Sequence, residues 1–184
     1  SKKIKGKILF YQNLKNLNWF NIGGKTKIYF KPENLKEIVD FLKLYKNRGK
    51  IFVLGAGSNI LFHDNIFNGV IIKLGSKFSN ISLLNENSIV AGSSTIDKKL
   101  SEFCRDNSIG GFEFLSCIPG SIGGGIRMNS GCFEREFKDI LISVQVVDFD
   151  GNVSTIPSDK IDFKYRHVSL PNNLIFLSAS FKGE

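Results

Sequence analysis

The stretch Ile118-Pro119-Gly120-Ser121-Ile122-Gly123-Gly124-Gly125 decides the fold of this 184-residue chain. Four glycines and a proline within eight residues are not expected in an ordinary helix or strand, because proline fixes φ and glycine tolerates positive φ. A backbone without side-chain cover offers N–H donors that a phosphate or a flat polar ring can reach. Phe, Leu and Ile flank the stretch more densely than is typical of a mobile surface loop. We therefore interpret it as a ligand-binding loop between two lobes.

A second glycine motif, Gly55-Ala56-Gly57-Ser58-Asn59, follows the apolar run 51–54. It begins like the dinucleotide fingerprint, but the third glycine, a long following helix and an acidic residue near position 75 are all missing. These absences argue against a Rossmann domain. The two glycine loops, 55–59 and 118–125, would instead close on opposite ends of one extended anionic cofactor, with Ser58, Asn59 and Ser121 adding hydroxyl and amide contacts.

Amino-acid composition argues against several classes of protein, among them disordered, membrane-spanning and disulfide-rich proteins. With 42% hydrophobic residues and 17 phenylalanines the chain is not disordered, and its apolar runs are too short to span a membrane. We expect no secretion signal, and therefore a cytoplasmic protein. Cys104, Cys117 and Cys132 lack paired spacing, so we expect three reduced, mostly buried thiols, with neither a disulfide framework nor a metal site. The net charge of +8 suits an anionic partner, but no nucleic-acid-binding motif occurs.

Hydrophobic patterning predicts two lobes, residues 1–78 and 79–184. In the first, strands are expected at 27–30, 51–54 (buried) and 70–74, with a helix that starts near Leu35 and ends at Gly49. In the second, strands are expected at 81–84, 88–91, 141–149, 153–156 and 174–181, with a helix capped by Ser94 or Thr95. Asp150-Gly151 is the strongest hairpin signal in the chain.

Five motifs, in this order, carry a resemblance to a known family. They are Asn21-Ile22-Gly23-Gly24, Val53-Leu54-Gly55-Ala56-Gly57-Ser58-Asn59-Ile60-Leu61, the run from Gly111-Phe112-Glu113-Phe114-Leu115 to Ile118-Pro119-Gly120-Ser121-Ile122-Gly123-Gly124, Met128-Asn129-Ser130-Gly131, and Asp162-Phe163-Lys164-Tyr165-Arg166. In these the chain resembles the UDP-N-acetylenolpyruvoylglucosamine reductases, also called UDP-N-acetylmuramate dehydrogenases. The resemblance covers nearly the whole chain.

The resemblance implies a fold and an activity. The fold is α+β, a two-lobed FAD-binding module of the vanillyl-alcohol-oxidase type. NADPH reduces the flavin, which then delivers hydride to the enolpyruvyl group of the UDP-sugar substrate and gives UDP-N-acetylmuramate for peptidoglycan synthesis. We expect a monomer that binds neither nucleic acid nor membrane.

The resemblance also implies roles for individual residues. Arg166 matches the catalytic arginine, and a guanidinium can stabilise the enolate formed by hydride addition. Tyr165 lies beside it at the substrate. The positions that match cofactor-binding motifs are Gly55, Ala56, Gly57, Ser58, Asn59, Pro119, Gly120, Ser121, Gly123, Gly124, Asn129 and Gly131.

The chain departs from the family in two places. It has Gly131-Cys132-Phe133-Glu134 where the family usually has Gly-Ala-Tyr-Gly, so a phenol and a glycine beside the flavin are missing. The family continues into a third, substrate-binding domain with a proton-donating Ser in a Gly-Ser-x-Phe-Lys-Asn-Pro-like motif and a late catalytic Glu, and neither occurs here. We interpret the chain as the FAD-binding part of a longer enzyme. The alternatives are another oxidoreductase of the same flavin superfamily and a non-catalytic nucleotide- or nucleic-acid-binding module.

Overall fold

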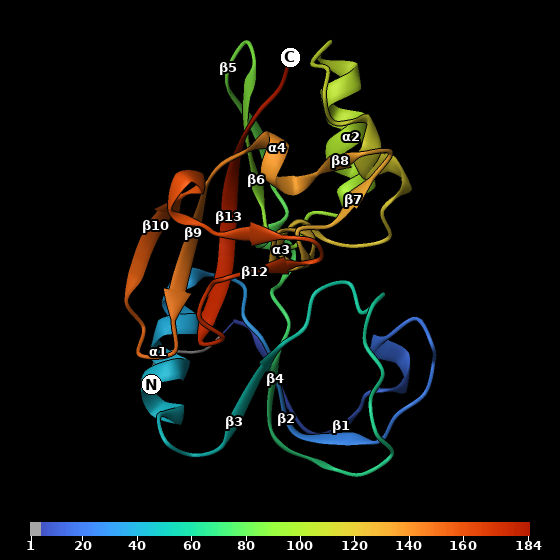
Figure 1. The fold of residues 1–184 in the computed structure, drawn as a ribbon. Coiled ribbons are helices and arrows are strands. Elements are labelled where there is room, and N and C mark those ends of the chain that lie inside the picture. The colour runs from blue at the N-terminus through green and yellow to red at the C-terminus, as the bar shows by residue number, and fades with distance from the viewer. Residues whose placement is uncertain (1–4) are drawn as a thin grey trace.

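The computed structural model describes residues 5–184, which form two sheets that lie one above the other in Figure 1. The first sheet has the strand order β1-β2-β4-β3 and takes its strands from residues 7–72. The second has the order β10-β9-β13-β6-β5 and takes its strands from residues 81–182. The presence of helices together with two separate sheets confirms the α+β prediction. The proposed lobe boundary at residue 78 falls in the connection between the sheets and stays a prediction.

The first sheet is mostly parallel. Its strands are β1 (Lys7–Asn13), β2 (Lys25–Lys31), β3 (Lys50–Val53) and β4 (Phe67–Ile72). β1 pairs antiparallel with β2, whereas β4 pairs parallel with both β2 and β3. The carboxyl ends of β2, β3 and β4 therefore share one edge, which is the edge where ligands commonly bind in such sheets.

Helix α1 (Leu35–Tyr45) connects β2 to β3 and packs against residues of both sheets. Asn34 caps it by accepting a hydrogen bond from the N–H of Glu37, and on its apolar face Ile38, Leu42 and Tyr45 are buried. Leu35 and Val39, on the same face, are half-buried. Phe41 stacks on Phe30 of β2 with 4.2 Å between ring centroids. The same hydrophobic cluster includes Ile175 and other residues of the second sheet, so one core continues between the lobes.

The second sheet is antiparallel throughout. Its strands are β5 (Ile81–Asn85), β6 (Ser88–Gly92), β9 (Leu141–Asp148), β10 (Val153–Pro157) and β13 (Leu174–Lys182). The hairpin predicted at Asp150-Gly151 is confirmed. Its turn is held by Asp148, whose Oδ1 accepts hydrogen bonds from the N–H groups of Asp150 and Asn152, both at 2.9 Å.

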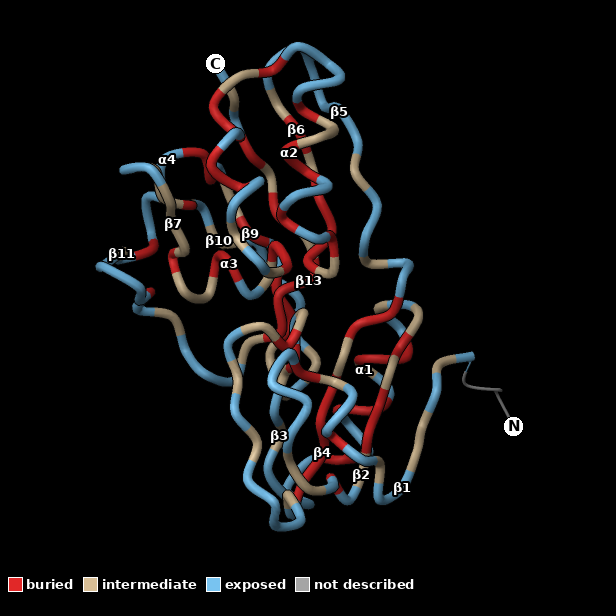
Figure 2. Tube along the Cα trace, turned by 90° about the vertical axis from the view of Figure 1, so that its right-hand side faces the viewer, coloured by how far each residue is buried: buried red, intermediate tan, exposed pale blue. Residues whose placement is uncertain are grey.

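Helices cover one side of this second sheet. They are α2 (Asp97–Asp106), α3 (Ile122–Met128) and α4 (Phe137–Ile140), with the 3-10 helix η3 (Glu113–Cys117). Figure 2 shows the buried residues running along the strands of both sheets and along the covering helices. Short elements complete the chain: η1 (Lys15–Leu17), η2 (Ser76–Phe78), η4 (Ser158–Lys160), β7 (Gly131–Cys132), β8 (Arg135–Glu136), β11 (Phe163–Lys164) and β12 (His167–Val168).

The glycine stretch differs from its prediction, because α3 begins inside it at Ile122. Glycine is costly in a helix, and the compensation here is close packing. A Cβ on Gly125 would overlap the ring of the fully buried Phe137, and a Cβ on Gly123 would lie 3.0 Å from the Cβ of Ser93. The glycines therefore allow a short helix to approach its neighbours where a larger residue would push it away.

Four smaller predictions are also wrong. Neither Ser94 nor Thr95 caps α2: its N-cap is Ile96, without a side-chain cap. Helix α1 ends at Tyr45, four residues before Gly49. β3 is not a fully buried strand, because the side chain of Phe52 is 37% exposed. Of the three free thiols only Cys104 is buried, while Cys117 is exposed.

Two features are absent from residues 5–184: a helix suited to crossing a membrane and a cluster of metal-ligating side chains. No helix there combines the length and the apolar character needed to cross a bilayer. No group of three His, Cys, Asp or Glu side chains in that range is placed to hold a metal ion.

Candidate functional site

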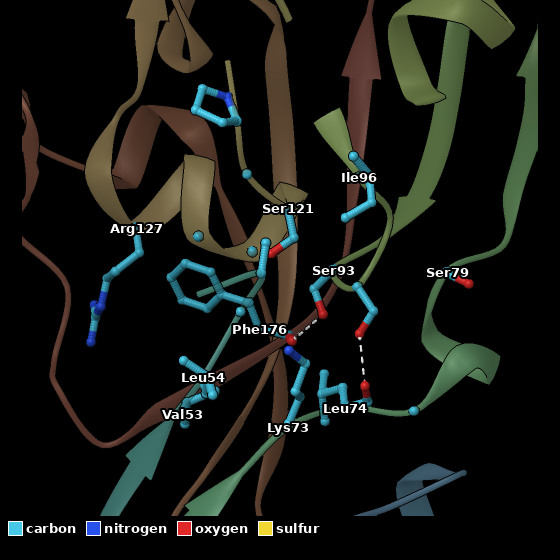
Figure 3. Close-up of a pocket in the computed structure, with 18 of the residues that line it drawn as sticks. Val53, Leu54, Lys73, Leu74, Ser79, Ser93, Ile96, Ser121, Arg127 and Phe176 are labelled. Atoms are coloured by element: carbon cyan, nitrogen blue, oxygen red, sulfur yellow. Dashed lines mark hydrogen bonds between the residues drawn. The ribbon is translucent and has the colours of Figure 1, made fainter. Parts of the chain in front are cut away.

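A cavity of about 1020 Å³ opens between the two sheets (Figure 3). One side of the cavity is formed by the shared carboxyl edge of β2, β3 and β4, together with Leu54 and Leu74 just beyond the strand ends. The opposite side comes from the second sheet and its helices, including Ser93, Phe176 and the start of α3. A mostly apolar cavity of this size with a few polar groups is typical of a cofactor site.

The first two residues of the loop 55–59, Gly55 and Ala56, present bare backbone to this cavity. Among the hydrogen bonds of residues 5–184, none is donated by a backbone N–H of residues 55–59. Gly57 has φ +79°, and a Cβ there would overlap the carbonyl of Leu17. A glycine is therefore required at this position for the loop to take its path, and the path leaves the N–H groups of Gly55 and Ala56 available to a ligand in the cavity.

The second glycine stretch is fastened to the start of α2. The N–H of Ile122 donates to the carbonyl of Thr95, and the N–H of Gly123 donates to that of Ser93, both at 2.9 Å. The N–H of Asp97 donates to the carbonyl of Gly120 at 3.2 Å. These bonds make the stretch a rigid wall of the cavity, in contrast to a mobile loop.

The two glycine loops touch each other directly, whereas they were predicted from the sequence to lie at opposite ends of one extended cofactor. Ser58 Oγ donates to the carbonyl oxygen of Pro119 at 2.5 Å, across 61 residues of sequence. A Cβ on Gly55 would lie 2.7 Å from Ser121 Oγ, so any larger residue there would displace the serine hydroxyl. The contact closes one end of the cavity with backbone from both lobes.

Ser121 carries an unsatisfied polar atom at the cavity wall. Its side chain is buried and lines the cavity, and its Oγ has no hydrogen-bond partner within residues 5–184. Buried hydroxyls without a partner are rare, because desolvation costs about 1–3 kcal/mol. The hydroxyl is therefore placed to bind a polar atom of a ligand.

The cavity is electropositive. Its lining includes Lys31, Lys73, Lys98 and Arg127 but no aspartate or glutamate. Arg127 donates to the carbonyls of Leu170 and Pro171, and burial lowers the pKa of its guanidinium. An anionic ligand is favoured in a cavity with this charge balance.

The cavity lining includes seven of the residues predicted from the sequence: Gly55, Ala56, Pro119, Gly120, Ser121, Gly123 and Gly124. Seven others lie outside that lining: Gly57, Ser58, Asn59, Asn129, Gly131, Tyr165 and Arg166. Ser58 still shapes the site through its bond to Pro119. The assignment of all these residues to cofactor or substrate stays a prediction.

Asn129 and Arg166 lie together beyond the far end of α3. Asn129 is fully buried in a left-handed conformation, and its side chain donates to Glu136 Oε2 at 3.1 Å and to the carbonyl of Lys164 at 3.2 Å. Arg166 donates from Nη2 to the carbonyl of Gly131 at 2.9 Å, and its guanidinium carbon is 5.2 Å from the ring centroid of Tyr165. The tyrosine ring is 81% exposed.

Sequence reasoning missed Lys31, Lys73, Arg127 and Phe176. Lys31 ends β2 and Lys73 directly follows β4, and the predicted strands alone do not show that these two strand ends are neighbours. Arg127 lies four residues after Gly123, on the same face of α3, but that helix was not predicted. No motif contains Phe176.

Comparison with known proteins identifies the family. Residues 26–156 match the family model described as FAD binding domain. The chain belongs to this FAD binding domain family. The cavity of this family member fits the cofactor: it is large enough for an extended dinucleotide, positively charged, and lined by bare backbone and the unpartnered Ser121 hydroxyl.

Individual relatives are longer than this chain. It is 58% identical over 183 residues to the UDP-N-acetylenolpyruvoylglucosamine reductase of Pelagibacter ubique (strain HTCC1062), covering 100% of this chain and 61% of that protein. It is 47% identical to the protein of the same name from Rickettsia canadensis (strain McKiel), covering 97% and 60%. The chain therefore spans about 60% of the length of these relatives.

Solved structures confirm the two-lobed FAD-binding fold of the vanillyl-alcohol-oxidase type. UDP-N-acetylenolpyruvylglucosamine reductase from Thermus caldophilus matches with a TM-score of 0.83 at 25% identity, covering 98% of this chain and 62% of that one. A BBE-like protein from Physcomitrella patens matches with a TM-score of 0.68 at 14% identity, covering 98% and 42%, and shares the fold alone.

Proposed function

We propose that this chain is the FAD-binding part of a UDP-N-acetylenolpyruvoylglucosamine reductase. The whole enzyme would use NADPH to reduce UDP-N-acetylenolpyruvoylglucosamine to UDP-N-acetylmuramate in the cytoplasm, as a monomer. The observation that carries the proposal is the 58% identity to the Pelagibacter ubique reductase over 183 residues, a region that contains both glycine loops.

The residues of this chain hold and orient the cofactor. FAD, when bound, supplies hydride chemistry, accepting a hydride from a nicotinamide and passing it to a substrate. The free N–H groups of the loop 55–59 bind anionic oxygens, and Ser121 Oγ binds a polar atom of the cofactor. Leu54, Leu74 and Phe176 exclude water from the cavity.

Arg166 supplies charge stabilisation in the substrate half of the reaction. Hydride addition to an enolpyruvyl double bond leaves an enolate, whose negative charge a guanidinium stabilises while it stays protonated. The ring of Tyr165 and the carbonyl of Gly131 hold the guanidinium in place from two sides. Tyr165 and Arg166 are both exposed, so the UDP-sugar can reach them from solvent.

The proton-donating serine of the family lies in a Gly-Ser-x-Phe-Lys-Asn-Pro-like motif, and these 184 residues do not contain that motif. After hydride transfer a general acid must protonate the carbon, a contribution typically of about 10² to 10⁴ in rate. We therefore expect the 184-residue chain to bind flavin without turning over the substrate.

The test uses the chain and the whole enzyme in parallel. Both should be yellow, with bound FAD released on denaturation and identified by chromatography. Only the whole enzyme should consume NADPH with UDP-N-acetylenolpyruvoylglucosamine. A colourless protein that binds no flavin would refute the FAD site. Flavin reduced by other alcohols or sugars, without activity on the enolpyruvyl substrate, would favour another oxidoreductase of the superfamily.

A further inference from the structure

Lys31 and Lys73 form a pair at the carboxyl edge of the first sheet. Lys31 is the last residue of β2, and Lys73 follows the last residue of β4. Phe30 is paired with Ile72 in the parallel register, and the N–H of Lys73 donates to the carbonyl of Phe30 at 3.0 Å. The next residues on both strands are the two lysines, so their side chains leave the sheet on the same face.

Both lysines line the cavity beside the first glycine loop. In Figure 3 the side chain of Lys73 points from the end of β4 into the cavity, toward Ser93 and Phe176. On the other side of β4 the N–H of Leu54 donates to the carbonyl of Ile72 at 2.8 Å, and Gly55 comes next in the chain. The two lysines therefore lie at the ends of β2 and β4, and the free N–H groups of Gly55 and Ala56 follow the end of β3, which pairs with β4.

Within the described part of the chain, no opposite charge neutralises Lys31 or Lys73. Neither lysine forms an ion pair or a side-chain hydrogen bond there, and the cavity lining holds no carboxylate. Burial and the neighbouring Lys31 lower the pKa of the Lys73 ammonium group. The other two cations of the lining differ, because Lys98 pairs with Glu102 and Arg127 donates to backbone carbonyls.

Two half-buried like charges repel each other, and an anion placed between them removes that cost. The free N–H groups next to them point to the same kind of ligand, one with several anionic oxygens close together. We propose that Lys31 and Lys73 bind the diphosphate of the flavin dinucleotide and thereby select FAD over flavins without a diphosphate. This inference rests on the proposed flavin site and adds the residues that determine which flavin it accepts.

The experiment compares three flavins on the apoprotein of the 184-residue chain. Dissociation constants for FAD, FMN and riboflavin are measured by flavin fluorescence with wild type, Lys31→Met, Lys73→Met and Lys73→Arg. Loss of a charged hydrogen bond should weaken FAD about 10- to 100-fold in Lys73→Met, FMN less, and riboflavin not at all. Lys73→Arg should recover most of the FAD affinity, because it keeps the charge.

Two readouts separate binding from support of the fold. Lys99→Met is the matched control, because Lys99 is exposed on α2 and outside the cavity lining, and it should bind all three flavins like wild type. The thermal midpoint of the apoprotein should stay equal or rise in Lys73→Met, since like-charge repulsion is removed. The FAD affinity of the wild type should also fall with added salt more steeply than that of the variant.

Several results would overturn the proposal. Equal weakening of FAD and riboflavin would show that the lysines only support the fold, and unchanged FAD affinity would remove them from the site. A UDP-N-acetylglucosamine titration distinguishes the second source of a diphosphate: weakened binding of the sugar nucleotide, with FAD unaffected, would assign the pair to the substrate. A wild-type chain that binds no flavin would instead refute the proposed function itself.

Discussion

Replacing Asp97 by asparagine should remove a pH dependence of folding stability. Asp97 is fully buried at the start of α2, and neither carboxylate oxygen has a hydrogen-bond partner within residues 5–184. Gly120 of the glycine stretch lies directly against it, since a Cβ there would be 2.6 Å from Asp97 Oδ2. Burial raises the pKa of this carboxyl from 3.8 to about 7.

The sign and size of the effect follow from this pKa. The folded state binds the proton more tightly than the unfolded state, so the stabilisation is complete below pH 3.8 and is lost as the pH rises to about 7. With about 1.36 kcal/mol for each tenfold change in proton affinity, the free energy of unfolding should fall by about 2.6 kcal/mol between pH 5 and pH 8. Asparagine keeps the shape and carries no charge at either pH.

Urea unfolding of the apoprotein at pH 5 and pH 8 measures this difference. Asp97→Asn should match wild type within about 1 kcal/mol at pH 5 and exceed it by about 2–3 kcal/mol at pH 8. Asp159→Asn, at an exposed aspartate, is the control and should leave the pH profile of wild type unchanged. Parallel profiles for wild type and Asp97→Asn would show that the carboxyl is solvated or paired in solution, and the reasoning from burial would fail.

Three further predictions concern the helix α3, the short hairpin after it and Arg166, which we propose to be catalytic. Gly123→Val should lower flavin content and destabilise the fold by about 1–3 kcal/mol, because its Cβ would press on Ser93; absorbance and thermal melts measure both, and full flavin retention would contradict it. Glu134→Gly should stabilise by about 1 kcal/mol in urea unfolding, since φ is +63°, whereas Glu86→Gly, at a turn residue outside the positive-φ set, should not. Arg166→Lys in the whole enzyme should slow flavin reoxidation by substrate about 10²- to 10³-fold in stopped-flow and leave reduction by NADPH unchanged; equal slowing of both would indicate a structural role.

Much of the fold could be predicted because local sequence determines it. The apolar period of residues 35–45 gives α1, and Asp150-Gly151 gives the hairpin, in both cases through interactions within a few residues. Helix α3 could not be predicted in this way. Its glycines are poor helix formers, and what favours the helix is contact with Phe137 and Ser93, which are distant in sequence or in another element.

The parts of the site that lie in sequence motifs were predicted, and the parts that depend on which strands pair were missed. Both glycine loops were expected to border one ligand, and residues of both line the cavity, but their direct contact through Ser58 and Pro119 was not expected. Lys31 and Lys73 lie in no motif, and they come together only because β2 pairs in parallel with β4. Single-sequence patterns predict strands, but they do not state which strands are neighbours.

The position of α3 explains why several predicted residues lie outside the cavity lining. Its first turn borders the cavity through Gly123 and Gly124, and its last residue leads into the left-handed Asn129. That buried amide accepts a hydrogen bond from the N–H of Lys138 and donates to the carbonyl of Lys164, two residues before Arg166. Asn129 thus links the cavity wall to the segment that carries Arg166. The structure therefore shows Asn129 holding the backbone of neighbouring segments, among them the segment that carries Arg166, the arginine that we propose to be catalytic.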